Sequence, residues 1–308
     1  MTDAAASSAP TADAAAAPVA ATAPVAPAVR SARPVRAQHV FVVERTERLS
    51  PHLVRVHLGG EAFDGFVEAG AEQLAATDRY VKLLLPPRPD RGLQPPFDLD
   101  ELRGRLEPDE LPVRRTYTIR SVDAAARTIA VDFVVHGDEG VAGPWALAAR
   151  PGDRLQMSSP GGLWSPSDDP AVPDLLLGDD SAVPAIASAL ESMAPDARGL
   201  ALIEVEGPDD ELVLARPDGV ELRWLHRAGA RPGSALLTAL RGLEPPTSPL
   251  RVFAHGERGA MKEARVVLHD TWGLERSSLS LSAYWALGRV EDAFQAEKRE
   301  PVGALFAD

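Results

Sequence analysis

The strongest constraint on the fold is a change of pattern near residue 168. Before it, polar and apolar residues alternate along six short segments, as they do in strands with one buried face. These segments are 39–44, 52–58, 79–85, 115–121, 128–136 and 154–158, and the stretches between them are rich in proline and glycine. Six short strands separated by turns favour a small antiparallel barrel. The stretch 86–112 is long for such a domain and is expected to be flexible or to form a lid.

After the proline-rich stretch 165–173, segments of strand length alternate with helical segments. Strands are predicted at 174–177, 200–206, 221–226, 251–254 and 278–284, and helices at 182–193, 233–241, 260–271 and 289–298. This alternation is typical of a Rossmann-like parallel α/β sheet. The predicted fold class is therefore β followed by α/β, with a barrel domain at 37–168 and an α/β domain at 169–308.

Residues 1–36 are rich in alanine and proline and have neither the basic start nor the continuous apolar core of a secretory signal. We predict a disordered tail without a catalytic role.

The composition excludes several classes of function. The chain has no cysteine, which excludes disulfides and iron–sulfur clusters, so any redox activity requires a bound cofactor. The histidines lack zinc-type spacing, and no metal site is predicted. A net charge of −13 argues against nonspecific nucleic-acid binding, and no apolar run has the length of a membrane span. We expect a cytoplasmic protein; the sequence does not specify the oligomeric state, and a monomer is the simplest expectation.

The predicted strand 115–121 carries the main candidate site. Strand alternation gives it two faces, with Arg115, Tyr117 and Ile119 on one and Thr116, Thr118 and Arg120 on the other. A guanidinium beside an aromatic ring, with hydroxyls on the other face, suits a ligand with a flat ring and phosphates.

The predicted strand 128–136 ends at His136, and Gly137, Gly140 and Gly143 follow. Pro144 would occupy the first turn of a helix that opens at Gly143, because proline is favoured there. The free N–H groups of Trp145, Ala146 and Leu147 would then form an anion site.

The α/β half lacks the G-x-G-x-x-G fingerprint of dinucleotide-binding domains. Two strand–turn–helix units remain as candidates, at 178–181 and 255–257, because open α/β sheets bind ligands at the carboxyl ends of their strands. From the residues alone a helix cap explains each unit better than a nucleotide site does, with Ser181 as a good N-cap residue.

Two motifs resemble the siderophore-interacting proteins, which are FAD-dependent ferric-siderophore reductases of the ferredoxin-reductase-like superfamily. R-x-Y-T-x-R at 115–120 is similar to the first flavin signature of that family. The segment 132–146, DFVVHGDEGVAGPWA, is similar to the second and departs from it at Val141, where the family usually has proline. GDDSAVPAI at 178–186, FAHGE at 253–257 and YW at 284–285 resemble further family segments.

The resemblance implies FAD as the cofactor, with NADH or NADPH as the electron donor. The residues that it implies for FAD are Arg115, Tyr117, Thr118, Ile119, Arg120, Val135, His136, Gly140, Ala142, Gly143, Trp145 and Ala146. Those that it implies for the nicotinamide side are Asp179, Ser181, Gly256 and Glu257. Thr118 would bond near flavin N5, and Trp285 would stack over the ring system and move aside for the nicotinamide, unless Trp285 is simply a core residue.

The implied substrate is a ferric siderophore. Hydride would pass to flavin N5 and single electrons to siderophore-bound Fe(III), releasing Fe(II) for iron assimilation. Lys82 is a candidate for the anionic substrate, although a solvated strand lysine is an equal interpretation. Arg289 is a candidate to replace the basic residue that the family commonly has at the position of Ala286. Arg223, Arg227 and Arg231 follow the third strand of the second domain and are candidates for a 2′-phosphate, but they do not decide between NADH and NADPH.

Two other functions remain open. One is a flavin reductase that exchanges electrons with a protein partner such as ferredoxin or an oxygenase. The other is a siderophore carrier without catalysis.

Overall fold

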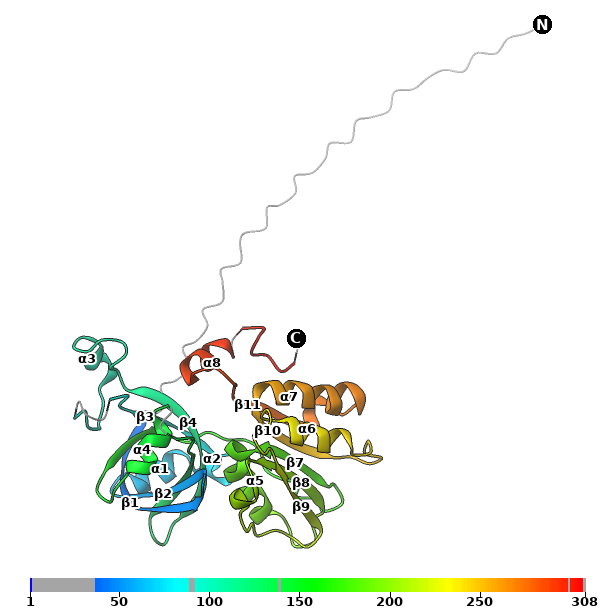
Figure 1. Cartoon of the computed structure of the whole chain (residues 1–308), viewed down its shortest axis with the longest axis horizontal. Helices are drawn as coiled ribbons and strands as arrows, with labels where there is room; N and C mark the ends of the chain where they lie inside the picture. Colours follow the sequence, from blue (N-terminus) through cyan, green and yellow to red (C-terminus); the bar gives the residue numbers. More distant parts are fainter. Residues whose placement is uncertain (2–36, 89–91, 138–139, 299, 307–308) are drawn as a thin grey trace. The chain divides into compact units, whose positions relative to one another are not determined.

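The first six strands close into an antiparallel barrel in the order β1-β2-β5-β4-β3-β6 (Figure 1). The computed structural model describes Met1 and residues 37–88, 92–137, 140–298 and 300–306, so the predicted tail lies, apart from Met1, outside the described residues. The strands are β1 (Gln38–Ser50), β2 (Leu53–Gly59), β3 (Tyr80–Leu85), β4 (Val113–Asp123), β5 (Thr128–Val134) and β6 (Arg154–Ser158). All six strands lie where the alternation predicts them.

Alternate side chains of these strands fill the barrel. Phe41, Val56, Leu83, Ile119 and Phe133 are each 0% exposed and belong to one apolar cluster. Burial of a side chain of this size contributes about 1.5–3 kcal/mol to stability. The barrel is therefore a packed core, and a ligand has to bind at its surface.

The barrel half also contains four short helices, α1 (Phe63–Ala69), α2 (Ala71–Ala75), α3 (Leu99–Arg103) and α4 (Ala142–Ala148). The first three are too short to show a helical repeat in the sequence. α3 lies within the stretch that was expected to be flexible or a lid. Its Leu102 packs with Phe97 against Leu84 of β3, so the described part of that stretch is anchored to the barrel.

The second half forms a five-stranded parallel sheet in the order β11-β10-β7-β8-β9, which confirms the predicted fold class. Its strands are β7 (Asp174–Asp179), β8 (Gly199–Val205), β9 (Val220–His226), β10 (Arg251–Glu257) and β11 (Leu279–Trp285). The last barrel strand ends at Ser158 and β7 begins at Asp174, on either side of the predicted domain boundary.

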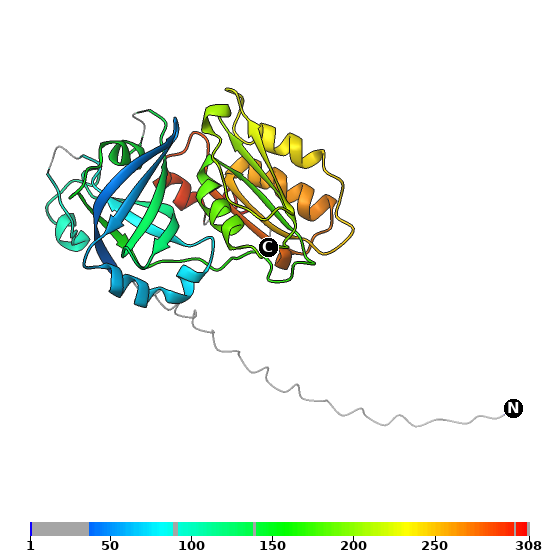
Figure 2. The same ribbon diagram turned by 90° about the horizontal axis from the view of Figure 1, so that it is seen from below.

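Helices cover both faces of this sheet. α5 (Val183–Ser192) packs on the face that carries Leu176, and α6 (Ser234–Arg241) and α7 (Arg258–Arg265) pack on the face that carries Leu175. Figure 2 shows α6 (yellow) and α7 (orange) on the opposite side of the strands from α5 (green). Because successive strand residues point to opposite faces, one apolar strand supplies both cores.

Several ends differ from the predictions. β7 and β10 extend to Asp179 and Glu257, so the candidate unit 255–257 and the first two residues of the unit 178–181 belong to strands. A 3₁₀ turn, Asp180–Ala182, precedes α5, and two more lie at Pro208–Asp210 and Arg276–Ser278. α7 begins at Arg258 and continues into a π-helical turn at Val266–Thr271, where the Trp272 N–H donates to the Val267 carbonyl. The last helix, α8, is Glu291–Glu297.

Side-chain hydrogen bonds join the two halves within the compact unit 36–308. His52 Nδ1 lies 2.8 Å from Asp210 Oδ2, and Ser50 Oγ donates to the other carboxylate oxygen at 2.8 Å. On β4, Arg120 Nη1 donates to Glu191 of α5 at 2.8 Å. The Arg120–Glu191 bond holds β4 against α5, and the bonds to Asp210 hold the β1–β2 turn against the second half.

Candidate functional site

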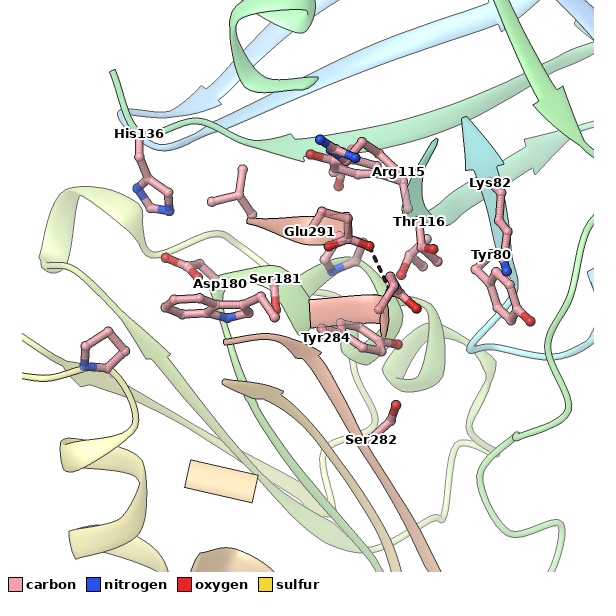
Figure 3. Close-up of a pocket in the computed structure, with 18 of the residues that line it drawn as sticks. Tyr80, Lys82, Arg115, Thr116, His136, Asp180, Ser181, Ser282, Tyr284 and Glu291 are labelled. Carbon is pink, nitrogen blue, oxygen red and sulfur yellow. Dashed lines mark hydrogen bonds between the residues drawn. The ribbon is translucent and has the colours of Figure 1, made fainter. Parts of the chain in front are cut away.

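One cavity of about 670 Å³ is lined by both halves of the chain (Figure 3). The volume lies within the roughly 300–1,000 Å³ that small-molecule sites occupy. Figure 3 shows Tyr80 and Lys82 at one end and His136 and Asp180 at the other. The lining residues are Tyr80, Lys82, Arg115, Thr116, Tyr117, Thr118, Asp132, Val134, His136, Asp180, Ser181, Pro184, Arg227, Pro232, Ser282, Tyr284, Trp285, Leu287, Glu291, Gln295 and Lys298.

Strand β4 supplies four consecutive wall residues, from Arg115 to Thr118. The Tyr117 ring packs on Phe133 at a centroid distance of 4.5 Å, which fixes its plane against the barrel core. Burial raises the pKa of the Tyr117 phenol, so it stays protonated. The Arg115 guanidinium donates to the Arg114 carbonyl at 2.8 Å and lies 3.4 Å from Asp292 of α8. A cation, a fixed ring and hydroxyls therefore face one space.

Several residues expected to bind FAD lie elsewhere. Ile119, Val135, Ala142 and Ala146 are part of the barrel core. Arg120 was expected to contact the ligand, but its guanidinium pairs with Glu191 of α5. The position along β4 explains the difference, because only the part of the strand before Ile119 lies along the cavity.

The start of α4 also differs from the prediction. The helix begins at Ala142, not Gly143, and the Trp145 N–H donates to the Val141 carbonyl at 3.1 Å. Trp145 therefore cannot offer its N–H to an anion, and Pro144 has none. Gly140 and Gly143 are likewise outside the cavity wall, and Trp145 instead packs on Phe133 at 5.6 Å. A pyrophosphate contact at this helix stays a prediction that rests on the N–H groups of Ala142 and Gly143.

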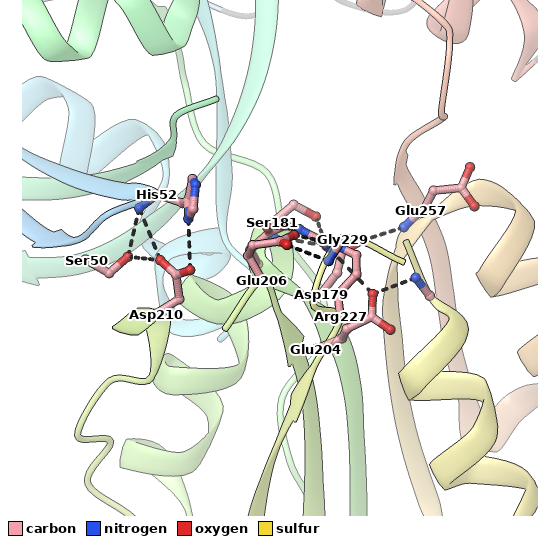
Figure 4. A network of polar contacts seen from close by, with 12 residues as sticks. Ser50, His52, Asp179, Ser181, Glu204, Glu206, Asp210, Arg227, Gly229 and Glu257 are labelled. Carbon is pink, nitrogen blue, oxygen red and sulfur yellow. Dashed lines mark hydrogen bonds and ion pairs between the residues drawn. The ribbon is translucent and has the colours of Figure 1, made fainter. Parts of the chain in front are cut away.

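On the α/β side, Asp179 is a hub beneath the wall and is not part of it. This buried carboxylate accepts hydrogen bonds from the Ser181 N–H (3.0 Å) and hydroxyl (2.5 Å) and from the Glu257 N–H (2.8 Å) (Figure 4). It also accepts one from Trp285 Nε1 at 2.8 Å. Burial, with repulsion from Asp180 as a smaller contribution, raises the pKa of Asp179 to about 7. Asp179 is the N-cap of the 3₁₀ turn, a place that was predicted for Ser181.

Gly256 and Glu257 have structural roles beside this hub. A Cβ at Gly256 would lie 2.6 Å from Asp179 Oδ2, so only glycine allows the approach. Glu257 caps α7 by accepting from the Ala260 N–H at 3.0 Å, and it also accepts from the Leu287 N–H at 3.1 Å. Both residues were expected to line the nicotinamide side, but neither lines the cavity. They instead position Trp285 and Leu287, which do.

The predicted substrate residues divide in the same way. Lys82 lies on the wall, whereas Arg289 is exposed outside it and donates to Glu297 at 2.7 Å. The cation that α8 brings to the cavity is Lys298, whose ammonium lies 4.7 Å from the Phe294 ring centroid. Arg289 therefore does not reach the cavity in this structure, where it was expected to replace the basic residue that the family commonly has at the position of Ala286.

His136 reaches the cavity as predicted. Burial lowers its pKa, and repulsion from His52 and Arg227 adds to the shift. The neutral imidazole is a hydrogen-bonding group at neutral pH and not a fixed cation.

The polar wall residues that sequence reasoning missed include Asp132, Asp180, Tyr284, Glu291 and Lys298. Burial raises the pKa of the Tyr284 phenol, which lines the cavity together with the Thr118 hydroxyl. Tyr284 precedes Trp285 in a family-like segment, and that position was a usable signal. α8 gave none, because nothing in its sequence indicates that it reaches β4.

The described residues contain no cluster of three or more metal-ligating side chains. Within the same part of the chain no helix is long and apolar enough to cross a membrane.

The wall fits the cofactors that the motifs imply. Arg115 and the hydroxyls of Thr116 and Thr118 face the same space as the Tyr117 ring, which matches a phosphate-bearing ring ligand. At the other end, Arg227 is 8% exposed, and its Nη1 has no hydrogen-bond partner among the described residues.

Comparison with known proteins gives matches to two family models. Residues 42–164 match the siderophore-interacting FAD-binding domain, and residues 173–288 match the siderophore-interacting protein family. The two models together cover the barrel and the parallel sheet.

Individual proteins match over most of their length. The ferric vibriobactin reductase of Vibrio cholerae is 32% identical over 256 residues, which are 82% of this chain and 91% of that protein. The NADPH-dependent ferric-chelate reductase of Escherichia coli is 33% identical over 248 residues, which are 79% and 91% of the two chains. The crystal structure of a siderophore-interacting protein from Aeromonas hydrophila covers 88% of this chain and 100% of its own, with a TM-score of 0.71 and 27% identity.

The Asp179 hub predicts a pH-dependent stability. The unfolded chain releases this proton near the ordinary pKa of 3.8, whereas the folded protein holds it to about pH 7. The folded state binds more protons between these values, so the free energy of unfolding falls as pH rises from about 4 to 7 and levels off above that.

The variant Asp179→Asn lacks the titrating group, so its stability relative to the native chain is expected to improve across that window and to stay constant above it. Urea unfolding from about pH 5 to pH 8 measures this. The exposed Asp209→Asn is the control and shows no trend. A difference for Asp179→Asn that does not change with pH would contradict the assignment.

Proposed function

Because the chain belongs to the siderophore-interacting protein family and is an FAD-dependent oxidoreductase, we propose that it reduces ferric siderophores with electrons from NADH or NADPH. The observation that carries the proposal is that one cavity is shared by β4 of the barrel and the carboxyl ends of the parallel strands. The flavin signature and the nucleotide side therefore open into the same space, as transfer of electrons between them requires.

The residues of β4 hold the cofactor. FAD supplies the chemistry, since it accepts a hydride from the nucleotide and passes electrons singly to Fe(III). Arg115 is expected to pair with pyrophosphate oxygens, and the Tyr117 ring, held by Phe133, to lie along the flavin. The Thr118 hydroxyl, which lines the cavity beside Tyr117, is expected to bond the N5 edge.

Trp285 is the residue that the nucleotide has to meet. Its indole edge is tied to Asp179 at 2.8 Å, so its ring has a defined place on the cavity wall. We expect the nicotinamide to displace the ring while Ser181 stays beside it. Asp179, Gly256 and Glu257 act through Trp285 and Leu287 as positioning residues.

The opposite end of the cavity suits an anionic iron chelate. The chain has three lysines, and two of them, Lys82 and Lys298, line this cavity although 216 positions separate them. Part of the Lys298 side chain is exposed, but protein around its ammonium lowers its pKa by desolvation; Glu291 opposes this shift, and the smaller repulsion from Lys82 adds to it. Two cations that repel each other in the free protein gain from a shared anionic ligand.

The metal belongs to the substrate. Siderophores hold Fe(III) through hard oxygen donors, and reduction to the softer Fe(II) weakens that grip. The proposal therefore assigns no protein ligand to the iron.

Two alternatives share this architecture. A flavin reductase that exchanges electrons with ferredoxin or an oxygenase would need the protein partner for turnover. A carrier would bind the ferric siderophore without oxidising NADH or NADPH. The lysine pair favours a small anionic substrate inside the cavity, because a protein partner would contact exposed surface.

The role of Arg115 is tested by its affinity for FAD. Arg115→Gln removes a charge-assisted contact to phosphate and is expected to weaken binding by about 1.5–3 kcal/mol, roughly ten- to a hundredfold. Titration of the apoprotein with FAD, followed by flavin fluorescence, measures this. Arg114→Gln is the matched control, because Arg114 is the exposed neighbour on the same strand and does not line the cavity. Equal losses in the two variants would refute the role of Arg115.

The substrate end is tested by steady-state reduction of a ferric siderophore with no protein partner present. Lys82→Ala and Lys298→Ala are each expected to raise KM for the siderophore roughly tenfold, with little change in kcat, because they remove binding charge far from the hydride step. Lys262→Ala is the matched control, since this third lysine donates to the Val302 carbonyl outside the cavity. Turnover that requires added ferredoxin, or unchanged KM values, would overturn this part of the proposal.

A further inference from the structure

The end of the cavity below β9 is a cage of carboxylates around one arginine (Figure 4). Arg227, the residue after β9, donates from Nε to Glu206 at 2.9 Å and from Nη2 to Asp180 at 3.4 Å. Its Nη1 lies 3.6 Å from Glu204. Arg227 and Asp180 line the cavity, and the side chain of Glu206 beside them is 38% exposed.

The charge of this cage is negative. Three carboxylates and one guanidinium sum to −2, or to −1 when Asp180 is protonated, since burial raises the pKa of Asp180. Glu206 stays ionised, because its hydrogen bond with Arg227 lowers its pKa. The carboxylates around Arg227 therefore outweigh its positive charge at this end of the cavity.

The cage cannot open easily to free Arg227. Glu204 is 0% exposed and accepts from the Gly233 N–H at 2.7 Å and the Leu236 N–H at 3.0 Å, at the start of α6. Glu206 also accepts from the Gly229 N–H at 2.7 Å. Rotation of either carboxylate away from Arg227 would leave backbone donors without partners, which is unfavourable.

The topology brings a nucleotide to this place. The strand order β11-β10-β7-β8-β9 has its switch point between β10 and β7, where open α/β sheets bind their ligands. From there the cavity wall continues through Asp180 and Ser181 to Arg227 and Pro232, along the strand ends toward β9. A dinucleotide whose nicotinamide is near Trp285 therefore extends its adenosine half over the cage.

We propose that the electron donor is NADH and that the cage of Asp180, Glu204, Glu206 and Arg227 rejects NADPH. The inference rests on the proposed use of a nicotinamide nucleotide. The exposed Glu206 carboxylate accepts a hydrogen bond from the ribose 2′-hydroxyl, while Arg227 stays paired with the carboxylates around it. A 2′-phosphate would place about two negative charges against the carboxylates.

The relative from Escherichia coli, at 33% identity, is named as NADPH-dependent. Overall similarity therefore does not decide the donor, and the charge around the ribose does.

The test compares binding of NAD⁺ and NADP⁺ to the oxidised, FAD-loaded full-length protein by calorimetry, with 5′-AMP and adenosine 2′,5′-bisphosphate as probes of the ribose end. The native protein is expected to bind NAD⁺ at least about tenfold more tightly than NADP⁺. Glu206→Gln keeps the shape of the side chain but removes one charge, and it should narrow that ratio roughly fivefold or more. Glu221→Gln is the matched control, because Glu221 pairs with exposed Arg223 on β9 and does not line the cavity.

Equal or tighter binding of NADP⁺ by the native protein would overturn the inference even if ferric siderophores are reduced. An identical effect of Glu206→Gln and Glu221→Gln would also overturn it. If neither nucleotide binds, the inference falls together with the proposed donor. A preference for NAD⁺ without ferric reduction would support the inference while the proposed substrate fails.

Discussion

A single buried carboxylate organises the site. Asp179, at the end of β7, accepts hydrogen bonds from Ser181 in the turn that follows, from Glu257 at the end of β10 and from Trp285 at the end of β11. It therefore joins the carboxyl ends of three parallel strands. A buried carboxylate is unfavourable unless its oxygens are satisfied, and here four donors satisfy them. The approach of β10 requires glycine at position 256. The place of Trp285, and with it the shape of the cavity, follows from this arrangement.

The site also shows why the global charge says little about ligands. A chain of net charge −13 presents Arg115, Lys82 and Lys298 to one cavity, while a carboxylate cage closes the far end. The two ends of the cavity carry charges of opposite sign, and in the proposed function each end binds a different group. Anionic groups bind near β3, β4 and α8, and an unphosphorylated ribose binds near β9. Because these charges face a confined space, they are screened less than charges on the open surface.

Much of this was predictable from the sequence, and the failures have physical causes. The alternation of polar and apolar residues predicted the six barrel strands, and the alternation of strand and helix segments predicted the parallel sheet. Both patterns are local, so they can be read from neighbouring residues. The motif around Tyr117 pointed to residues that line the cavity, namely Arg115, Tyr117 and Thr118. Arg120 was misplaced because a motif does not say where a strand leaves its ligand and meets a neighbouring helix. Lys298 was missed as a site residue because only tertiary packing of α8 brings it within reach of Lys82.

The central claim is that one cavity receives electrons from a nucleotide and passes them to an iron chelate without a protein partner. Anaerobic absorbance spectroscopy of the purified protein tests this most directly. The account predicts a yellow protein that bleaches on addition of NADH and regains its colour when a ferric siderophore is added. A colourless protein, or a bleached flavin that the ferric siderophore leaves reduced until ferredoxin is supplied, would contradict it.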